Sequence, residues 1–169
     1  MRVLGLVATL GAVISFFPAF SIRPEPPLDP NNALSTLFVV RYETLIPVGD
    51  VNAGCVINHL MDANHNQYDD VGALNWDFRV KRMWQGDEFT IPCSVTKSFK
   101  MKPPIVSGDL VLNVNFRPIL IPAFLGRTSW QSNFRFILVE ASDRTYRWIP
   151  EPTGFTPTIP DWLVGPSAN

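Results

Sequence analysis

Hydrophobic residues along this chain follow two patterns, one continuous and one alternating. From Val3 to Ile22 no side chain is charged. A helix of about 18–20 such residues, rising about 1.5 Å per residue, crosses the roughly 30 Å hydrocarbon layer of a bilayer. After residue 34, apolar residues instead occupy every second position in short segments, which is the period of strands with one buried face. The patterns predict an N-terminal membrane segment followed by a strand-built domain.

The apolar run allows three interpretations. It is longer than the core of a cleavable signal peptide, about 7–15 residues, which favours a retained transmembrane helix. Ala19 and Ser21 place small residues at the −3 and −1 positions of a signal-peptidase site, so a cleaved signal is the second interpretation. A buried helix of a soluble protein is the third. Under the first interpretation, the domain lies on the periplasmic or extracellular side of the inner membrane. Under the second, the domain is exported to the same side and is secreted.

The alternating segments predict an all-β fold. Alternation is cleanest between Leu110 and Phe116, where Asn113 and Asn115 separate apolar residues. Strands with one apolar face must bury that face against a second sheet. We therefore expect an immunoglobulin-like or fibronectin-like β-sandwich preceded by one N-terminal transmembrane helix, with a small barrel as the alternative. The expected strands lie at residues 38–42, 51–57, 76–84, 89–95, 110–116, 134–138 and 146–149.

Proline-rich stretches at both ends predict the limits of the domain, because they favour extended, semi-rigid chain. The expected organisation is a membrane anchor or signal segment at 1–22, a proline-rich linker at 23–33, the sandwich at 34–150 and a proline-rich tail at 151–169. Aromatic residues near the C-terminal prolines either form a partner-docking tail or fold back over the sandwich: Trp148, Phe155 and Trp162.

Composition and motifs exclude several classes of function. The 169 residues carry a formal net charge of −1, which argues against nucleic-acid binding. No nucleophile elbow, zinc-protease helix, phosphate loop or dinucleotide-binding turn is present. We therefore expect no enzymatic activity and no cofactor.

Several short segments resemble a known group of proteins. These are Phe38-Val-Val-Arg-Tyr, the strand carrying Cys55, Trp84-Gln-Gly-Asp-Glu-Phe-Thr-Ile-Pro, Asp109-Leu-Val-Leu-Asn-Val-Asn-Phe-Arg-Pro, Phe134-Arg-Phe and Tyr146-Arg-Trp. Over residues 37–150 the chain resembles small uncharacterised bacterial proteins with one N-terminal membrane segment and an extracytoplasmic immunoglobulin-like domain. The resemblance implies a fold and a location, and no chemistry.

The two cysteines, Cys55 and Cys93, both fall on the apolar faces of their expected strands. In an exported protein this placement predicts a disulfide between two strands. The alternative is two separate buried thiols that act as small hydrophobic residues. Their spacing is not that of a C-x-x-C redox motif.

An acidic and amide-rich segment between Asp62 and Asp70 is a candidate calcium loop, with oxygen ligands expected from Asp62, Asn64, Asn66 and Asp70. Gln67 stands where such a loop has glycine, and Ala73 where it has its bidentate acid. The alternative is an ordinary solvated turn, which also favours Asn and Asp. His59 and His65 flank the segment, and a zinc site there would need Asp69 or Asp70.

Basic residues cluster in the middle of the chain. One interpretation is a surface that contacts an anionic partner such as lipid headgroups, and the other is lysines and arginines that protect an exposed sheet edge. The candidate contact residues are Arg79, Lys81, Arg82, Lys97, Lys100 and Lys102.

The sequence thus predicts a membrane-tethered extracytoplasmic β-sandwich that is a non-catalytic binding or structural module of the cell envelope. Its expected partners are the membrane, through the N-terminal helix, and a protein of the envelope. The alternative is a secreted calcium-binding or hydrolytic domain that uses the segment from Asp62 to Asp70.

Overall fold

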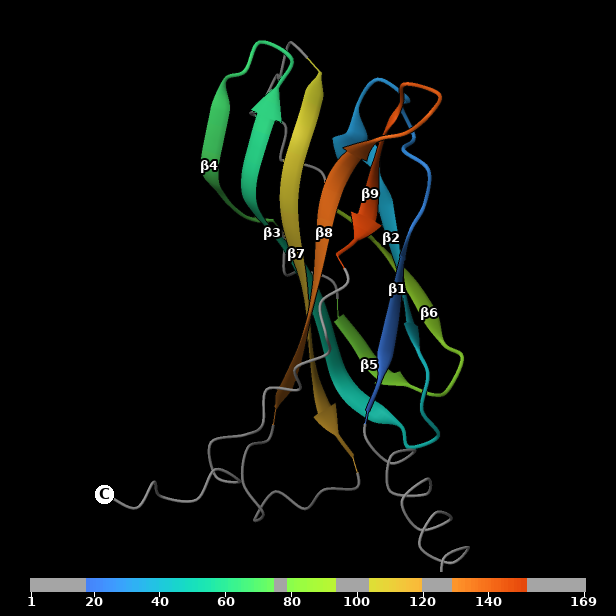
Figure 1. Ribbon diagram of the computed structural model, residues 1–169. Helices are drawn as coiled ribbons and strands as arrows, with labels where there is room; N and C mark the ends of the chain where they lie inside the picture. Colours follow the sequence, from blue (N-terminus) through green and yellow to red (C-terminus); the bar gives the residue numbers. More distant parts are fainter. Residues whose placement is uncertain (1–17, 75–78, 94–103, 120–128, 152–169) are drawn as a thin grey trace, which may run out of the picture.

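The chain folds as an all-β protein, as the alternating pattern predicts. The computed structural model describes residues 18–74, 79–93, 104–119 and 129–151 (Figure 1). Within these ranges the secondary structure consists of strands and one short 3₁₀ helix, η1 (Ala33–Ser35). The strands are β1 (Phe20–Pro24), β2 (Leu37–Tyr42), β3 (Val48–Asp62), β4 (Gln67–Leu74), β5 (Arg79–Met83), β6 (Glu88–Pro92), β7 (Ile105–Pro118), β8 (Trp130–Glu140) and β9 (Tyr146–Pro150).

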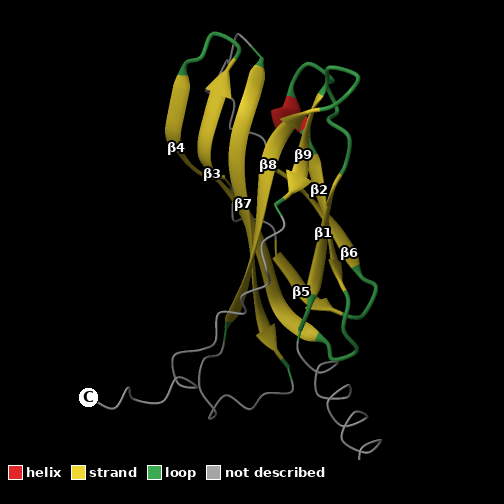
Figure 2. Cartoon of the chain, viewed as in Figure 1, coloured by secondary structure: helices red, strands yellow, loops and turns green. Residues whose placement is uncertain are grey.

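The strands form two antiparallel sheets in a sandwich-like arrangement (Figure 2). The smaller sheet has the order β1-β2-β6. The larger sheet has the order β4-β3-β7-β8-β9, and β5 pairs with β3 beside this path. The long strands β3 and β7 pair from Val48 and Pro118 at one end to Asp62 and Ile105 at the other. Two ends of the sandwich are therefore defined: the first end, where β1 and β3 begin, and the second end, where the hairpin between β3 and β4 turns.

The core lies between the two sheets and is built from alternate residues of both. Phe38 of the smaller sheet meets Phe136 of the larger sheet edge to face, with ring centroids 5.0 Å apart. Phe20 contacts Tyr42 and Phe116 at centroid distances of 5.1 and 5.0 Å. Apolar strand faces buried in this way supply the main driving force for folding. The largest fully buried side chains also include Ile57, Leu60, Met83, Leu110, Leu112, Val40, Val48, Val51 and Val114.

The N-terminal boundary differs from the prediction. Phe20, Ser21 and Ile22, assigned above to the membrane segment, belong to β1 and pair with β2. Arg23 and Pro24, assigned to the linker, complete the same strand. Hydropathy alone cannot show where the membrane segment ends and β1 begins, because an apolar strand buried in a core is as hydrophobic as a membrane segment. The proline is tolerated because β1 is an edge strand.

Among the residues that the structure describes, no helix is long and apolar enough to cross a bilayer. Residues 1–17, which form most of the predicted membrane segment, lie outside the described residues. The proline-rich tail from residue 152 onward lies outside them as well.

Two further segments differ from the predicted strands. The acidic segment does not form one long loop, because residues from Gln67 onward belong to β4. In the expected strand at 76–84, alternation of Val80 and Trp84 with Arg79 and Lys81 predicts that Trp84 is buried, but Met83 is buried and Trp84 is 53% exposed. The pairing of β5 with β3 keeps one register from Val48 and Met83 to Asn52 and Arg79, and β5 ends at Met83, so Trp84 lies in the connection that follows the strand.

Candidate functional site

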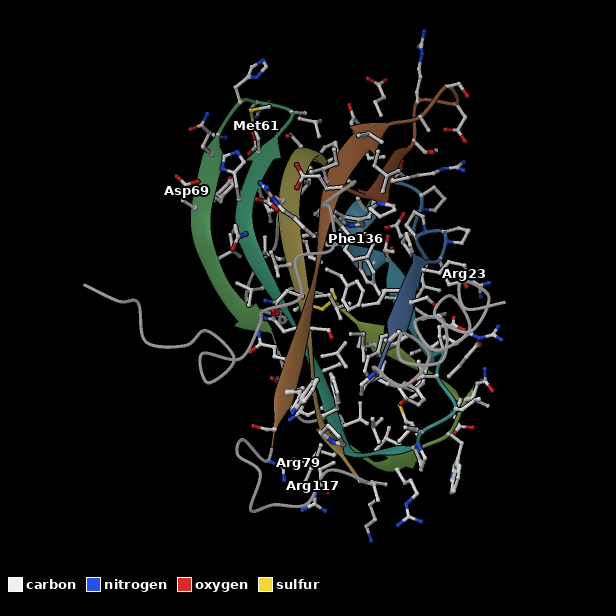
Figure 3. All side chains as sticks on the ribbon, turned by 60° about the horizontal axis from the view of Figure 1, so that its bottom comes forward. Arg23, Met61, Asp69, Arg79, Arg117 and Phe136 are labelled. Carbon is white, nitrogen blue, oxygen red and sulfur yellow. A yellow bond between two sulfur atoms is a disulfide. The ribbon has the colours of Figure 1, made fainter. Side chains whose placement is uncertain are left out.

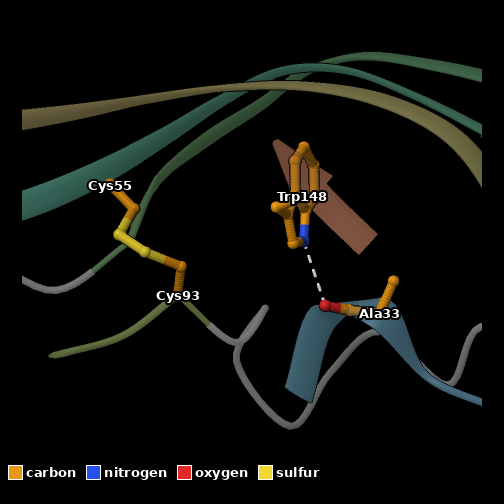
Figure 4. The surroundings of a disulfide bond; sticks show 4 residues. All are labelled: Ala33, Cys55, Cys93 and Trp148. Atoms are coloured by element: carbon orange, nitrogen blue, oxygen red, sulfur yellow. Dashed lines mark hydrogen bonds between the residues drawn. A yellow bond between two sulfur atoms is a disulfide. The ribbon is translucent and has the colours of Figure 1, made fainter. Parts of the chain in front are cut away.

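The clearest covalent feature is a disulfide between Cys55 and Cys93, as the sequence predicts (Figure 4). Cys55 lies in β3 and Cys93 directly follows β6, so the bridge joins the larger sheet to the smaller one. The Cα atoms are 5.7 Å apart, inside the usual range for a disulfide. The two residues are only 1% and 2% exposed, which places the bridge inside the core.

Trp148 of β9 lies in the same part of the core (Figure 4). It is 3% exposed, and its indole Nε1 donates a hydrogen bond to the carbonyl oxygen of Ala33 at 3.0 Å. Gly108 makes room for it, because a Cβ there would lie 2.9 Å from Cη2 of Trp148. The interpretation of Trp148 as part of a docking tail is therefore wrong. Phe155 and Trp162 lie outside the described residues.

Asp62 organises the turn between β3 and β4. Its Oδ1 accepts hydrogen bonds from the backbone N–H groups of Asn64 and Asn66, at 2.8 and 3.0 Å. Its Oδ2 accepts from the Asn66 side-chain amide at 2.9 Å and from the Tyr68 hydroxyl at 3.0 Å. His65, with a positive φ of 63°, completes the turn. Asp62 is 1% exposed, so its carboxylate serves as the internal acceptor of an Asx-type turn.

This arrangement does not support the proposed calcium loop. Both oxygens of Asp62 already face donors, and the amide nitrogen of Asn66, rather than its oxygen, points toward the carboxylate. Asp70 belongs to β4, and its side chain lies outside what the structure describes. Within the described ranges, no group of three or more His, Cys, Asp or Glu residues is arranged to hold a metal ion.

The stability contributed by Asp62 should depend on pH. Burial raises the pKa of its carboxyl, but hydrogen bonds from Asn66, Tyr68 and Asn64 lower the pKa by more. The folded-state pKa therefore lies below the unfolded value of about 3.9. The ionised carboxylate consequently stabilises the fold above that pH, and this stabilisation is lost as the pH falls through the folded-state pKa.

We expect Asp62→Asn to lower the melting temperature at neutral pH, because the new amide group places a donor against the donors of Asn66 and Tyr68. The difference from wild type should narrow as the pH falls below about 4, where the wild-type carboxylate also takes up a proton. Asp50→Asn is the matched control, since Asp50 pairs with Arg117 at 3.2 Å on the exposed surface. Equal melting temperatures for wild type and Asp62→Asn at neutral pH would contradict this role.

A second charged group lies on the outer face of the larger sheet. Arg135 binds both carboxylate oxygens of Asp109, at 2.9 and 2.8 Å, and also pairs with Glu151 at 2.9 Å. The hydrogen bonds from Arg135 are the main reason that the pKa of Asp109 is lowered. His59 pairs with Asp69 at 2.6 Å beside this group. In the described part of the chain, no hydroxyl or thiol hydrogen-bonds to His59, so the pair has no nucleophile to activate there.

Three of the six candidate basic residues lie in the described part of the chain, and all three belong to one strand. Arg79, Lys81 and Arg82 are exposed on β5, an edge strand. Among the described residues, none of these three has a carboxylate within ion-pair distance, whereas Arg23, Arg41, Arg117, Arg135 and Arg147 each have one. The guanidinium of Arg82 lies 6.0 Å from the ring centroid of Trp84. Lys97, Lys100 and Lys102 lie outside the described residues.

The outer face of the larger sheet also carries an array of uncharged amide side chains. In the register of the sheet, Asn52, Asn115 and Gln131 lie side by side on β3, β7 and β8. The next rung consists of Gly54, Asn113 and Asn133. Gln131 donates to Asn133 at 2.7 Å and to Asn113 at 3.4 Å. We name the side chains of Asn52, Asn113, Asn115, Gln131 and Asn133 the amide face; each is half-buried or exposed.

Comparison with protein-family models, with curated proteins and with solved structures finds no match for this chain. Two features escaped the sequence analysis: the amide face and the exposure of Trp84. The alternation of Asn113 and Asn115 with apolar residues was visible, but only the register places them beside Asn52 and Gln131.

Proposed function

We propose that this chain is a membrane-tethered, extracytoplasmic β-sandwich of immunoglobulin-like type that acts as a non-catalytic binding module of the bacterial cell envelope. The observation that carries the proposal is the buried Cys55–Cys93 disulfide between the sheets. Disulfides form and persist in oxidising compartments such as the periplasm, and cytosolic thiols are kept reduced. A core that contains such a bridge favours export.

The tether is supported by the apolar run that precedes β1. No charged residue occurs between Val3 and Ala19, and this run leads directly into the first strand at Phe20. The immunoglobulin-like assignment is supported by a disulfide that joins two sheets near a buried tryptophan, Trp148. The non-catalytic role is supported by the isolated His59–Asp69 pair described above.

Compartment and tether can be tested together in a bacterial host. The full chain and a variant lacking residues 1–17 are expressed, cells are fractionated, and free thiols are alkylated before denaturation and again after it. We expect the full chain in the membrane fraction with no alkylated cysteine. The truncated variant should remain in the cytosol with Cys55 and Cys93 reactive once denatured. Full-length protein that is dissolved in the cytosol with two free thiols would contradict the proposal.

The amide face is the proposed binding surface. Each amide offers both donors and an acceptor, which suits the hydroxyl and amide groups of cell-wall glycan strands. Its residues come from three adjacent strands of a rigid sheet, so their spacing is fixed before binding. Because the array carries no net charge, we expect binding to vary little with salt, unlike contact with an anionic polymer.

Binding can be measured by sedimentation of the full chain with isolated cell-wall sacculi. The variant Asn113→Ser with Gln131→Ser should lose most of the retention, since it removes amides from both rungs while leaving the buried face intact. Gln67→Ser, an exposed amide on β4, is the matched control. Equal retention of the two variants would contradict glycan binding by the amide face and would leave the compartment test unaffected.

A further inference from the structure

We propose that the first end of the sandwich is a membrane-docking surface that binds anionic lipid headgroups through Arg79, Lys81 and Arg82, with Trp84 and Leu45 inserted among the lipids. The inference rests on the membrane tether proposed above and adds to it an orientation and a set of contact residues.

Exposed apolar side chains gather at this end. Leu45 is 70% exposed in the connection between β2 and β3, and Trp84 is 53% exposed in the connection between β5 and β6. Both connections lie where β1 begins, because Tyr42 pairs with Phe20 and Met83 pairs with Val48. Tryptophan is enriched at membrane interfaces, where its amphipathic ring lies at the level of the headgroups.

The acids described at this end leave three basic side chains without an ion pair. Four acidic residues occur there within the described ranges, and each has another contact. Asp50 pairs with Arg117, Glu43 and Glu88 both pair with Arg41, and Asp87 accepts a hydrogen bond from the Trp84 backbone. Arg79, Lys81 and Arg82 have no such partner among the described residues and stay available to phosphate groups.

The two ends of the sandwich differ in chemistry. Figure 3 shows Arg79 and Arg117 together at the first end, and Asp69 and Met61 toward the second. At the second end, the exposed charged residues are of both signs: Asp69, Glu140 and Asp143 with Arg144 and Arg147. The cluster of three basic side chains on one strand lies at the first end, so an anionic membrane surface would attract that end more strongly.

The path of the chain brings the first end to the membrane. The Ala19 carbonyl accepts a hydrogen bond from the Glu43 backbone N–H, so β1 and the connection after β2 start side by side. The uncharged run in the sequence continues into β1 as far as Ile22, so no linker separates it from the sandwich. A segment held in the bilayer would thus place Leu45 and Trp84 close to the lipid surface.

The test uses the full chain reconstituted into vesicles of phosphatidylcholine with or without phosphatidylglycerol. Both native cysteines are in the disulfide, so a single introduced cysteine can be labelled selectively with an environment-sensitive fluorophore. Leu45→Cys probes the first end, and Ser142→Cys, exposed in the turn after β8, probes the second. Nitroxide-labelled acyl chains then report which label enters the lipid.

We expect quenching at position 45 only, in vesicles with phosphatidylglycerol, and less quenching as salt rises. Each Lys or Arg near an anionic surface strengthens binding by about fivefold. Arg79→Gln, Lys81→Gln and Arg82→Gln combined should therefore weaken docking by roughly a hundredfold and abolish most of the quenching. Arg144→Gln, at the second end, is the control and should leave it unchanged.

The outcomes separate this inference from the proposed tether. Docking is overturned, and the tether left intact, if the protein floats with the vesicles but shows no quenching at position 45. The same conclusion follows if quenching occurs but is reduced neither by the triple glutamine substitution nor by salt. Protein that does not float with the vesicles overturns both. Thermal unfolding of the triple variant confirms its fold, because the three side chains are exposed.

Discussion

Trp148→Ala should destabilise the protein by about 3–5 kcal/mol, the range for removing a large aromatic side chain from a packed core. Trp148 is 3% exposed and packs over Gly108, and its ring reaches the carbonyl group of Ala33. The variant loses the burial of the indole ring and leaves a cavity in the core. It also leaves the buried carbonyl oxygen of Ala33 without its hydrogen-bond donor. Urea denaturation followed by circular dichroism measures the change in the free energy of unfolding.

Two further variants separate the contribution of the buried ring from that of its hydrogen bond to Ala33. Trp148→Phe keeps an aromatic ring but loses the donor to Ala33, so its cost should fall between those of wild type and Trp148→Ala. Trp84→Ala removes the same side chain from an exposed turn and should cost less than about 1 kcal/mol. Similar losses for Trp148→Ala and Trp84→Ala would show that Trp148 is not a core residue.

Removal of the disulfide by Cys55→Ala together with Cys93→Ala should lower the free energy of unfolding by about 4 kcal/mol. The bridge closes a loop with a sequence separation of 38 residues, and the loop-closure entropy of the unfolded chain gives this magnitude. The paired substitution is chosen because a single one leaves a free thiol in the core. The double variant is compared with wild type by chemical denaturation under non-reducing conditions.

Reduction of the wild-type protein provides the control for this pair. Adding a thiol reductant should destabilise wild type by a similar amount and leave the double variant unchanged. A double variant within about 1 kcal/mol of oxidised wild type would show that the bridge does not constrain the unfolded chain. It would also weaken the argument for an oxidising compartment.

The inner faces of the long strands could be predicted from sequence, because side chains alternate across a strand whatever the topology. Leu110, Leu112, Val114 and Phe116 are buried as the alternation indicates. The same reasoning placed Cys55 and Cys93 on inner faces. It could not assign the pairing of strands, because antiparallel partners are chosen by long-range contacts that leave no local signal.

The predictions that differ from the structure do so for local physical reasons. Phe20 and Ile22 belong to an apolar run, and nothing in that run marks where membrane-compatible sequence becomes a core strand. A strict period of two extends the strand as far as Trp84, but β5 ends at Met83 and Trp84 lies in the connection to β6. The oxygen-rich spacing of Asp62 and Asn64 suits both a calcium loop and an Asx turn, and only the direction of the donors distinguishes them.

The position of Phe20 constrains how the newly made protein can mature. A peptidase that cut after Ser21 would remove Phe20 and Ser21, the first two residues of β1. The aromatic ring that fills the space between Tyr42 and Phe116 would leave with the discarded fragment. Once β1 has paired with β2, the backbone around the scissile bond is also hydrogen-bonded within a sheet. Cleavage at that bond would therefore cost the sandwich one end of its first strand and the aromatic contacts of Phe20.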